Sequence, residues 1–288
     1  MNFTKPDSLF NYGMKISIYS EKMAEQADDK AGGWFRGGDR ISYYGNGIKK
    51  DICYTSKGYY TAAFNYKFTH DDDTVYFSYC YPYTYSDLNQ DIQEIESDPE
   101  RRAICSRKTL CKTLAGIDCE ILTVTEKADF EVMKKKRAVI ISARVHPGET
   151  VGSWMMRGVL FFITDPHNEE AKILRDKFVF KIIPMLNPDG VINGNYRCSL
   201  AGCDLNRRWK VPHRQLHPTI WSTKKMLRDI HNERGVLMYC DLHGHSRKQN
   251  VFMYGCNNKA KPEECRVFPL ILSKLSKLFY FGSCRFGV

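Results

Sequence analysis

Residues with metal-binding side chains follow two apolar segments of this sequence. His146 and Glu149 stand three positions apart after the first segment, and His243 and His245 follow a second one much further along the chain. A histidine and a glutamate at this spacing can reach one ion from a single loop or from the first turn of a helix. Catalytic zinc usually has three protein ligands, of which two histidines and a glutamate are a standard set, and keeps a fourth position for water or substrate. These residues therefore predict a zinc site.

The identity of the third ligand stays open between two histidines. The chain has eight histidines, and those outside the two clusters lie in polar or helical segments: His70, His167, His213, His217 and His231. Apart from His146 itself, only His243 and His245 follow a predicted buried strand. A His-x-x-Glu pair on its own often arises by chance, so the zinc hypothesis depends on the second cluster and on where both clusters lie in the fold.

The predicted elements explain how such distant residues can meet. Apolar segments at 138–143, 178–186 and 236–240 are predicted to be strands, and helices are predicted over 151–163 and 219–232. Strands that alternate with helices favour an α/β domain with a mixed, largely parallel sheet and helices on both faces. Sites in open sheets of this kind form at the carboxyl ends of the strands. We therefore expect the polar clusters that follow these strands to converge.

The first part of the chain has a different pattern. Segments 59–68 and 74–81 are aromatic and partly alternating, which predicts strands with no helix between them and thus an antiparallel β-sandwich. A helix is then predicted over 84–96, where apolar residues recur on one face. We predict two domains, an N-terminal β-sandwich over 1–83 and the α/β domain over 84–288.

Composition narrows the class of protein. Hydrophobic residues are 43% and charged residues 26% of the 288 residues, which is ordinary for a globular protein. No apolar run has the length of a transmembrane helix, so a membrane is not a predicted partner. None of the eleven cysteines shows the C-x-x-C spacing of structural zinc sites, and reduced thiols in a cytosolic protein fit them best.

The net charge of +10 favours an acidic partner, which charge alone does not identify. The basic run at 134–137 is interpreted as the solvated approach to the strand that follows it. Because no interleaved aromatic residues and no nucleic-acid-binding motif accompany it, nucleic acid is not a predicted partner.

Four motifs in this order resemble the cytosolic carboxypeptidases, a family of zinc carboxypeptidases of the carboxypeptidase A type. They are His-Pro-Gly-Glu at 146–149, Asn-Pro-Asp-Gly at 187–190, Asp-Leu-Asn-Arg-Arg-Trp at 204–209 and Asp-Leu-His-Gly-His-Ser at 241–246. Segments 33–38 and 79–86 resemble the family's N-terminal β-sandwich and its junction, so the resemblance covers nearly the whole chain. Four ordered motifs together are highly specific.

The resemblance implies one zinc ion per chain, held by His146, Glu149 and His243. It thereby chooses His243 over His245. Zinc in such a site polarises a carbonyl and lowers the pKa of its bound water. Asp241 could orient a zinc-bound histidine or could simply end a strand, and it ranks below the three ligands.

The resemblance also implies how substrate is held. Arg197 matches the arginine that steadies the oxyanion at the scissile carbonyl, where a cation contributes most in the transition state. Asn206 and Arg207 match the pair that binds the terminal carboxylate of the substrate, to which an arginine can make two parallel hydrogen bonds. Arg208 and Asp204 rank lower, as a surface residue and the start of a turn.

The activity implied by the resemblance is that of a cytosolic metallocarboxypeptidase. It would hydrolyse C-terminal or side-chain-linked glutamates from acidic protein tails, with polyglutamylated proteins such as tubulin as partners and a location in the cytosol and on microtubules. The positive net charge suits such an anionic substrate. The alternative is a catalytically incomplete zinc-binding fragment or a module that binds acidic tails.

One implied residue is missing from the motifs. Enzymes of this class use a glutamate as general base, and in the family it lies downstream of the third zinc ligand. Only Glu263 and Glu264 follow His243, and neither has the family's surroundings. We therefore expect the sequence to be incomplete at its C-terminus, with the general base beyond Val288.

Overall fold

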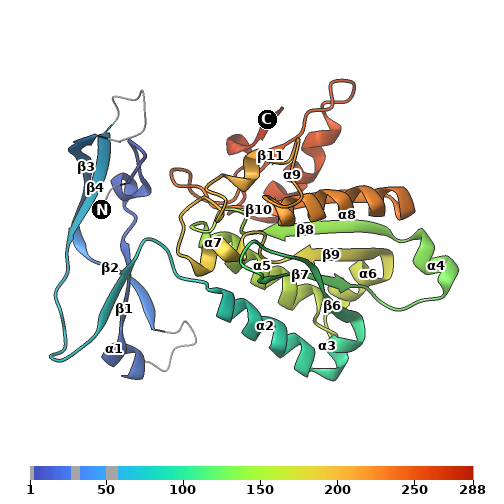
Figure 1. Ribbon diagram of the computed structural model, residues 1–288, viewed down its shortest axis with the longest axis horizontal. Coiled ribbons are helices and arrows are strands. Elements are labelled where there is room, and N and C mark those ends of the chain that lie inside the picture. Colours follow the sequence, from blue (N-terminus) through green and yellow to red (C-terminus); the bar gives the residue numbers. More distant parts are fainter. Residues whose placement is uncertain (1–2, 27–32, 50–57, 288) are drawn as a thin grey trace. The chain divides into compact units, whose positions relative to one another are not determined.

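A five-stranded sheet organises the larger of the two units into which the computed structural model divides (Figure 1). The structure describes residues 3–26, 33–49 and 58–287, and this unit spans residues 15–39 and 66–244. The strand order is β10-β8-β9-β7-β6. In chain order the strands are β6 (Cys105–Lys112), β7 (Asp118–Val124), β8 (Arg137–Ala143), β9 (Phe178–Ile183) and β10 (Val236–Leu242).

The sheet is mixed, as predicted. The three predicted strands are β8, β9 and β10, and β8 pairs in parallel with both of the others. The hairpin of β6 and β7 is not among the predicted strands, and β7 pairs antiparallel with both β6 and β9. The prediction of a largely parallel sheet therefore holds for the block that carries the motifs and is wrong for the β6–β7 edge.

Helices cover both faces of this sheet (Figure 1). The helical segments after residue 84 of this unit are α2 (Tyr85–Ser97), α3 (Pro99–Ile104), α4 (Phe130–Lys135), α5 (Thr150–Ile163), α6 (Glu169–Lys177), α7 (Pro188–Ile192), the 3-10 turn η2 (Leu205–Arg207) and α8 (Pro218–Arg234). Successive side chains of a strand point to opposite faces. Val139 and Ile141 of β8 accordingly pack in one core with α2 and α5, whereas Ala138 and Ile140 pack in another with α8.

The remaining elements of the larger unit include a three-stranded antiparallel sheet in the order β2-β1-β5. Its elements are β1 (Ile16–Ser20), α1 (Glu21–Gln26), β2 (Trp34–Gly37) and β5 (Val75–Ser78). The segment predicted as a strand over 74–81 contains β5. The predicted β-sandwich and the domain boundary at residue 83 stay predictions.

The smaller unit spans residues 1–14, 40–65 and 245–288. Its elements are η1 (Leu9–Tyr12), β3 (Asp39–Lys49, whose first residue falls in the larger unit), β4 (Gly58–Asn65), β11 (Tyr254–Gly255), α9 (Glu264–Leu275), η3 (Phe281–Ser283) and β12 (Arg285–Phe286). The described cysteines are free thiols, and Cys53 lies outside the described residues. Among the described helices, none is both long and apolar enough to cross a membrane.

Gly152 allows α5 to lie against the end of β10. A Cβ atom built on Gly152 would be 2.7 Å from the backbone oxygen of Leu242, which is closer than side chains approach in proteins. Gly158 lies on the same helix, is exposed, and would have nothing within 4 Å of an added Cβ. Because His243 directly follows Leu242, the contact at Gly152 also helps to fix the backbone position of that histidine.

We expect Gly152→Ala to lower the free energy of unfolding by about 1–3 kcal/mol, the usual cost of overpacking a close-packed contact. Gly158→Ala is the matched control, because its methyl group meets nothing and alanine favours a helix over glycine by about 1 kcal/mol. Urea titrations followed by circular dichroism measure both changes. Equal effects of the two substitutions would contradict the close contact between α5 and β10.

Candidate metal centre

Three side chains from two distant parts of the sequence meet beyond the ends of β8 and β10. Each of His146, Glu149 and His243 offers one ligand atom, and these atoms all lie within 4.8 Å of one another. The two strands run parallel with Ala143 opposite Leu242, so both end at the same edge of the sheet. The predicted convergence of the two clusters at the carboxyl ends of the strands is therefore confirmed.

Of the two histidines that spacing left open, the candidate cluster contains one. Among the described residues, His243 belongs to the cluster of side chains that could hold a metal ion, and His245 does not. The Nδ1 atom of His245 instead accepts hydrogen bonds from the backbone N–H groups of Arg247 and Lys248, at 3.2 and 2.9 Å. The resemblance had chosen His243 for the same position.

Glu149 lies between the two histidine rings. Its Oε1 is 3.0 Å from Nδ1 of His146, and its Oε2 is 2.9 Å from Nδ1 of His243. The Gly244 N–H also donates to Oε2, at 2.9 Å. Burial acts to raise the pKa of Glu149, but the hydrogen bonds from both histidines outweigh it and hold this pKa well below its ordinary value. The carboxylate is therefore charged, as a carboxylate ligand of a metal must be, and its two oxygens face the Nδ1 atoms of the two histidines.

The outer nitrogen of each histidine is held by a separate carboxylate. Nε2 of His146 is 3.0 Å from Oδ1 of Asp204, and Nε2 of His243 is 2.7 Å from Oδ2 of Asp241. A histidine that donates its outer N–H to a carboxylate keeps the other nitrogen's lone pair for a metal, and such pairs are usual around zinc. Without a metal, burial acts to lower the pKa of His243, but Asp241 and Glu149 outweigh it and raise that pKa to about 10. Zinc would therefore displace a proton from this imidazole on binding. The donor set and its outer partners fit a zinc ion.

Asp204 has more contacts than the start of a turn requires. Its Oδ1 accepts the Asn206 N–H at 2.9 Å and so caps the short turn η2. Its Oδ2 accepts from Nε of Arg197 at 2.8 Å, and Nη1 of Arg197 is 4.0 Å from Oε1 of Glu149. Arg197 is thus half-buried beside the predicted ligands, where a cation could meet a developing negative charge. Its catalytic role stays a prediction.

The predicted carboxylate-binding pair lies on η2, directly after Asp204. Asn206 is partly buried, and its Oδ1 accepts from the Trp209 indole N–H at 2.9 Å. The Arg207 side chain is exposed, and its Nη1 donates a long hydrogen bond of 3.4 Å to the carbonyl oxygen of Asn206. An exposed guanidinium can turn to bind an anion with two parallel bonds. The substrate-binding role of this pair stays a prediction.

Arg144 shapes the loop that carries the first two predicted ligands, and nothing in the sequence analysis gave it a role. It is buried and has a φ of 58°, which is unusual for a residue with a side chain. Its guanidinium donates to the carbonyl oxygens of Pro147 and Tyr83 and to the hydroxyl of Ser153. Burial lowers the pKa of Arg144 to about 10, so it stays charged at neutral pH. Its position two residues before His146 offered no pattern in the sequence that would distinguish it.

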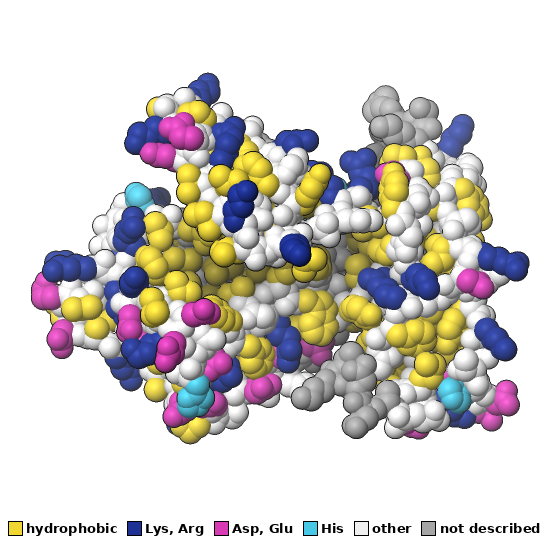
Figure 2. Space-filling view, turned by 180° about the vertical axis from the view of Figure 1, so that it is seen from behind, with side chains coloured by type: hydrophobic (Ala, Val, Ile, Leu, Met, Phe, Trp, Pro, Cys, Tyr) yellow, Lys and Arg dark blue, Asp and Glu magenta, His cyan; other side chains and the backbone are white. Residues whose placement is uncertain are grey.

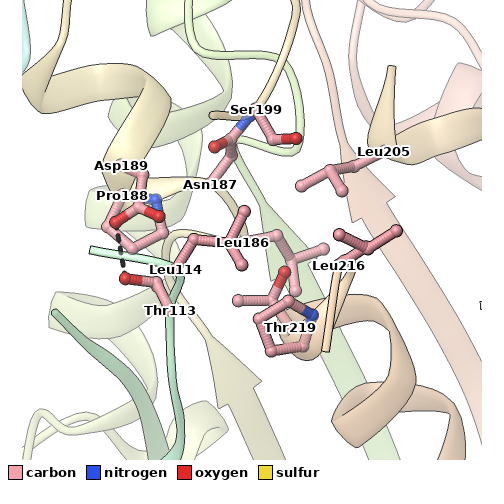
Figure 3. A pocket seen from close by; sticks show the side chains of 11 residues that line it. Thr113, Leu114, Leu186, Asn187, Pro188, Asp189, Ser199, Leu205, Leu216 and Thr219 are labelled. Atoms are coloured by element: carbon pink, nitrogen blue, oxygen red, sulfur yellow. Dashed lines mark hydrogen bonds between the residues drawn. The ribbon is translucent and has the colours of Figure 1, made fainter. Parts of the chain in front are cut away.

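A small pocket lies beside the second motif rather than at the metal centre (Figure 3). Asn187, Asp189 and Leu205 are among its lining residues, and none of the three predicted ligands is. Asp189 accepts from the Thr113 hydroxyl at 2.5 Å, and the Asn187 amide donates to the Val145 carbonyl oxygen at 3.3 Å. The second motif therefore braces the strand end that precedes His146, and supplies no ligand itself.

Comparison with known proteins identifies the family to which the chain belongs. The model of the zinc carboxypeptidases matches residues 88–278. Cytosolic carboxypeptidase 3 of Mus musculus is 46% identical over 295 residues, which cover all of this chain and 28% of the relative. Cytosolic carboxypeptidase 2 of Danio rerio is 48% identical and covers 99% of this chain and 39% of the relative. The chain therefore spans about a quarter to two fifths of the length of these relatives.

Solved structures show the same fold. A metallo-carboxypeptidase from Burkholderia cenocepacia superimposes with a TM-score of 0.72 at 22% identity, over 96% of this chain and 64% of the other. A carboxypeptidase A homologue from Shewanella denitrificans superimposes with a TM-score of 0.68 at 24% identity, over 92% of this chain and 67% of the other. At such identities the likeness concerns the fold alone.

We expect zinc to stabilise the metal-free protein, by about 2.7 kcal/mol when its concentration is 100 times the dissociation constant. His243→Ala should abolish this stabilisation, because it removes one of three ligands. His245→Ala is the matched control and should keep it. Thermal unfolding with zinc and with a chelator measures the difference, and a zinc effect that survives His243→Ala but not His245→Ala would reverse the assignment of the third ligand.

Proposed function

Because the chain belongs to the zinc carboxypeptidases, in their cytosolic carboxypeptidase branch, we propose that it forms the zinc and substrate centre of a metallocarboxypeptidase. The observation that carries the proposal is the convergence of His146, Glu149 and His243, with the outer nitrogen of each histidine held by a carboxylate. When bound there, zinc would polarise the scissile carbonyl and acidify a water molecule. The three side chains would hold the ion, and Asp204 and Asp241 would keep the two rings turned toward it.

Arg197 is the residue we propose for stabilising the oxyanion. Its Nε is occupied by Asp204 at 2.8 Å, which fixes the guanidinium plane beside the predicted ligands. A cation that is already oriented when charge develops on the substrate needs no rearrangement in the transition state. Asp204 thereby orients His146 and Arg197 together.

Asn206 and Arg207 are the residues we propose for binding the substrate's terminal carboxylate. An exopeptidase has to recognise a free carboxylate, and an exposed arginine next to an amide suits that task. Both lie on the short turn that Asp204 caps, so the residue that holds His146 also places the pair.

For the substrate we propose glutamates at the ends or on the side chains of acidic protein tails, such as those of tubulin, in the cytosol and on microtubules. The net charge of +10 supports an anionic partner, since a positive protein raises the local concentration of an anionic chain. Lys and Arg side chains are spread over the face shown in Figure 2, with Asp and Glu between them. The attraction on this face would therefore be diffuse, and Arg207 would supply the specific contact.

A second candidate function is binding of acidic tails without cleavage. The observation that favours it is that neither of the two glutamates that follow His243 is placed like a general base. Both Glu263 and Glu264 are exposed, they lie at the start of α9, and Glu264 pairs with Lys261 at 2.8 Å. Neither has the features of a general base, so the described residues include no assigned base.

We expect a peptide that ends in several glutamates to bind this chain more tightly with a free C-terminal carboxylate than with a C-terminal amide, by about tenfold or more, since a hydrogen bond to a charged group contributes about 1.5–3 kcal/mol. Arg207→Ala should remove this preference. Arg228→Ala, on the exposed face of α8, is the control and should keep it. Calorimetry gives the affinities, and an assay of free glutamate distinguishes cleavage from binding.

Equal affinity for the two peptides would contradict the proposed carboxylate-binding pair. Carboxylate-dependent binding with no release of glutamate would support the second candidate function for this chain.

A further inference from the structure

A chain of hydrogen bonds runs from His243 back into the sheet. Nε2 of His243 meets Oδ2 of Asp241 at 2.7 Å, and Oδ1 of the same carboxylate is 2.7 Å from Oγ of Ser142. The Ser142 oxygen is in turn 2.8 Å from the hydroxyl of Tyr239. Ser142 and Asp241 stand opposite each other in the parallel pairing of β8 and β10, so the contact is built into the register of the strands.

The chemistry of the groups gives this chain a direction. A carboxylate only accepts hydrogen bonds, and a serine hydroxyl has a single proton to donate. Ser142 therefore donates to Asp241, and its oxygen accepts from Tyr239. Both oxygens of Asp241 are then occupied, one by Ser142 and one by His243, which holds the carboxylate plane at two points.

We propose that Ser142 is a positioning residue for the metal ligand His243 and acts through Asp241. This inference rests on the zinc site of the proposed function. Ser142 is completely buried, so no solvent molecule can take over its hydrogen bond if the hydroxyl is removed. The Asp241 carboxylate could then rotate, and the imidazole that it holds would rotate with it.

The carboxylate that holds His146 is fixed by a different kind of donor. Asp204, which holds His146, is fixed at its second oxygen by the guanidinium of Arg197 at 2.8 Å. Each outer carboxylate thus contacts one histidine and accepts from one further side chain, and Asp204 also accepts the Asn206 N–H. Ser142 is the counterpart of Arg197, with the difference that it is a neutral group inside the sheet and cannot reach substrate.

The test measures the zinc dissociation constant by competition with a chromogenic chelator, using the whole chain. We expect Ser142→Ala to raise it about tenfold, at the lower end of the 10–100-fold effects seen when the outer partners of metal ligands are changed. Tyr239→Phe is the matched control, because it removes a hydroxyl from the same chain but leaves the bond from Ser142 to Asp241. It should change zinc affinity less than about twofold, a shift well below the tenfold effect expected at Ser142.

Two further measurements separate positioning from a general loss of packing. In an Asp241→Ala background, Ser142→Ala should have almost no additional effect on zinc affinity, because residues that act through each other are not additive. Ser142→Thr keeps the hydroxyl while adding a methyl group to a buried site, so it should lower stability yet retain zinc affinity close to wild type. The visible spectrum of the cobalt-substituted protein should change in Ser142→Ala and stay unchanged in Tyr239→Phe.

The outcomes distinguish this inference from the proposed function. If wild type binds zinc and Ser142→Ala binds it equally well, the positioning role is wrong and the zinc site stands. If Ser142→Ala weakens zinc binding by the same factor with and without Asp241, the serine acts through packing, and the inference is overturned. If wild type does not bind zinc, the proposed function itself fails.

Discussion

The parallel pairing of β8 with β10 is the constraint on which the candidate site depends. It brings residues from two motifs nearly a hundred positions apart to the same edge of the sheet, with Ala143 opposite Leu242. A shift of one residue would turn each side chain to the other face, and Ser142 would no longer face Asp241. The close approach of α5 at Gly152 supports the same strand end from the helix side. The backbone geometry of the two strands and of α5 therefore places the predicted ligands close together.

The site solves the problem of placing several charges in a partly buried region. Burial alone would disfavour the charged form of Glu149 and the protonated form of His243. Each carboxylate instead lies within hydrogen-bond distance of several polar partners: Glu149 of two imidazoles and a backbone N–H, and Asp204 of an imidazole, a guanidinium and a backbone N–H. Removing one partner from such a network leaves the others buried without a partner, which is why the outer groups matter for the metal.

Much of the fold and of the site could be predicted from patterns in the sequence. The apolar strands β8, β9 and β10 and the helices α2, α5 and α8 lie where periodicity placed them, because buried elements have a strong apolar signature. The hairpin of β6 and β7 was missed. Its first strand, Cys105–Lys112, has charged residues and faces solvent on part of its surface, so its apolar pattern is weak. That hairpin makes one edge of the sheet antiparallel.

The sequence by itself determined the donor set, the family and the order of the motifs, because residue types and local spacing are written directly in it. Spacing left His243 and His245 as alternatives, and resemblance to a family chose the first. Only the tertiary structure decided that the Nδ1 atoms face Glu149, and which groups hold the rings from outside. Asp204 lies 58 residues from His146 along the chain, and Ser142 lies 99 residues from the Asp241 carboxylate that it contacts. Hydrogen bonds over such separations arise from strand register and loop conformation, which no local pattern of residues specifies.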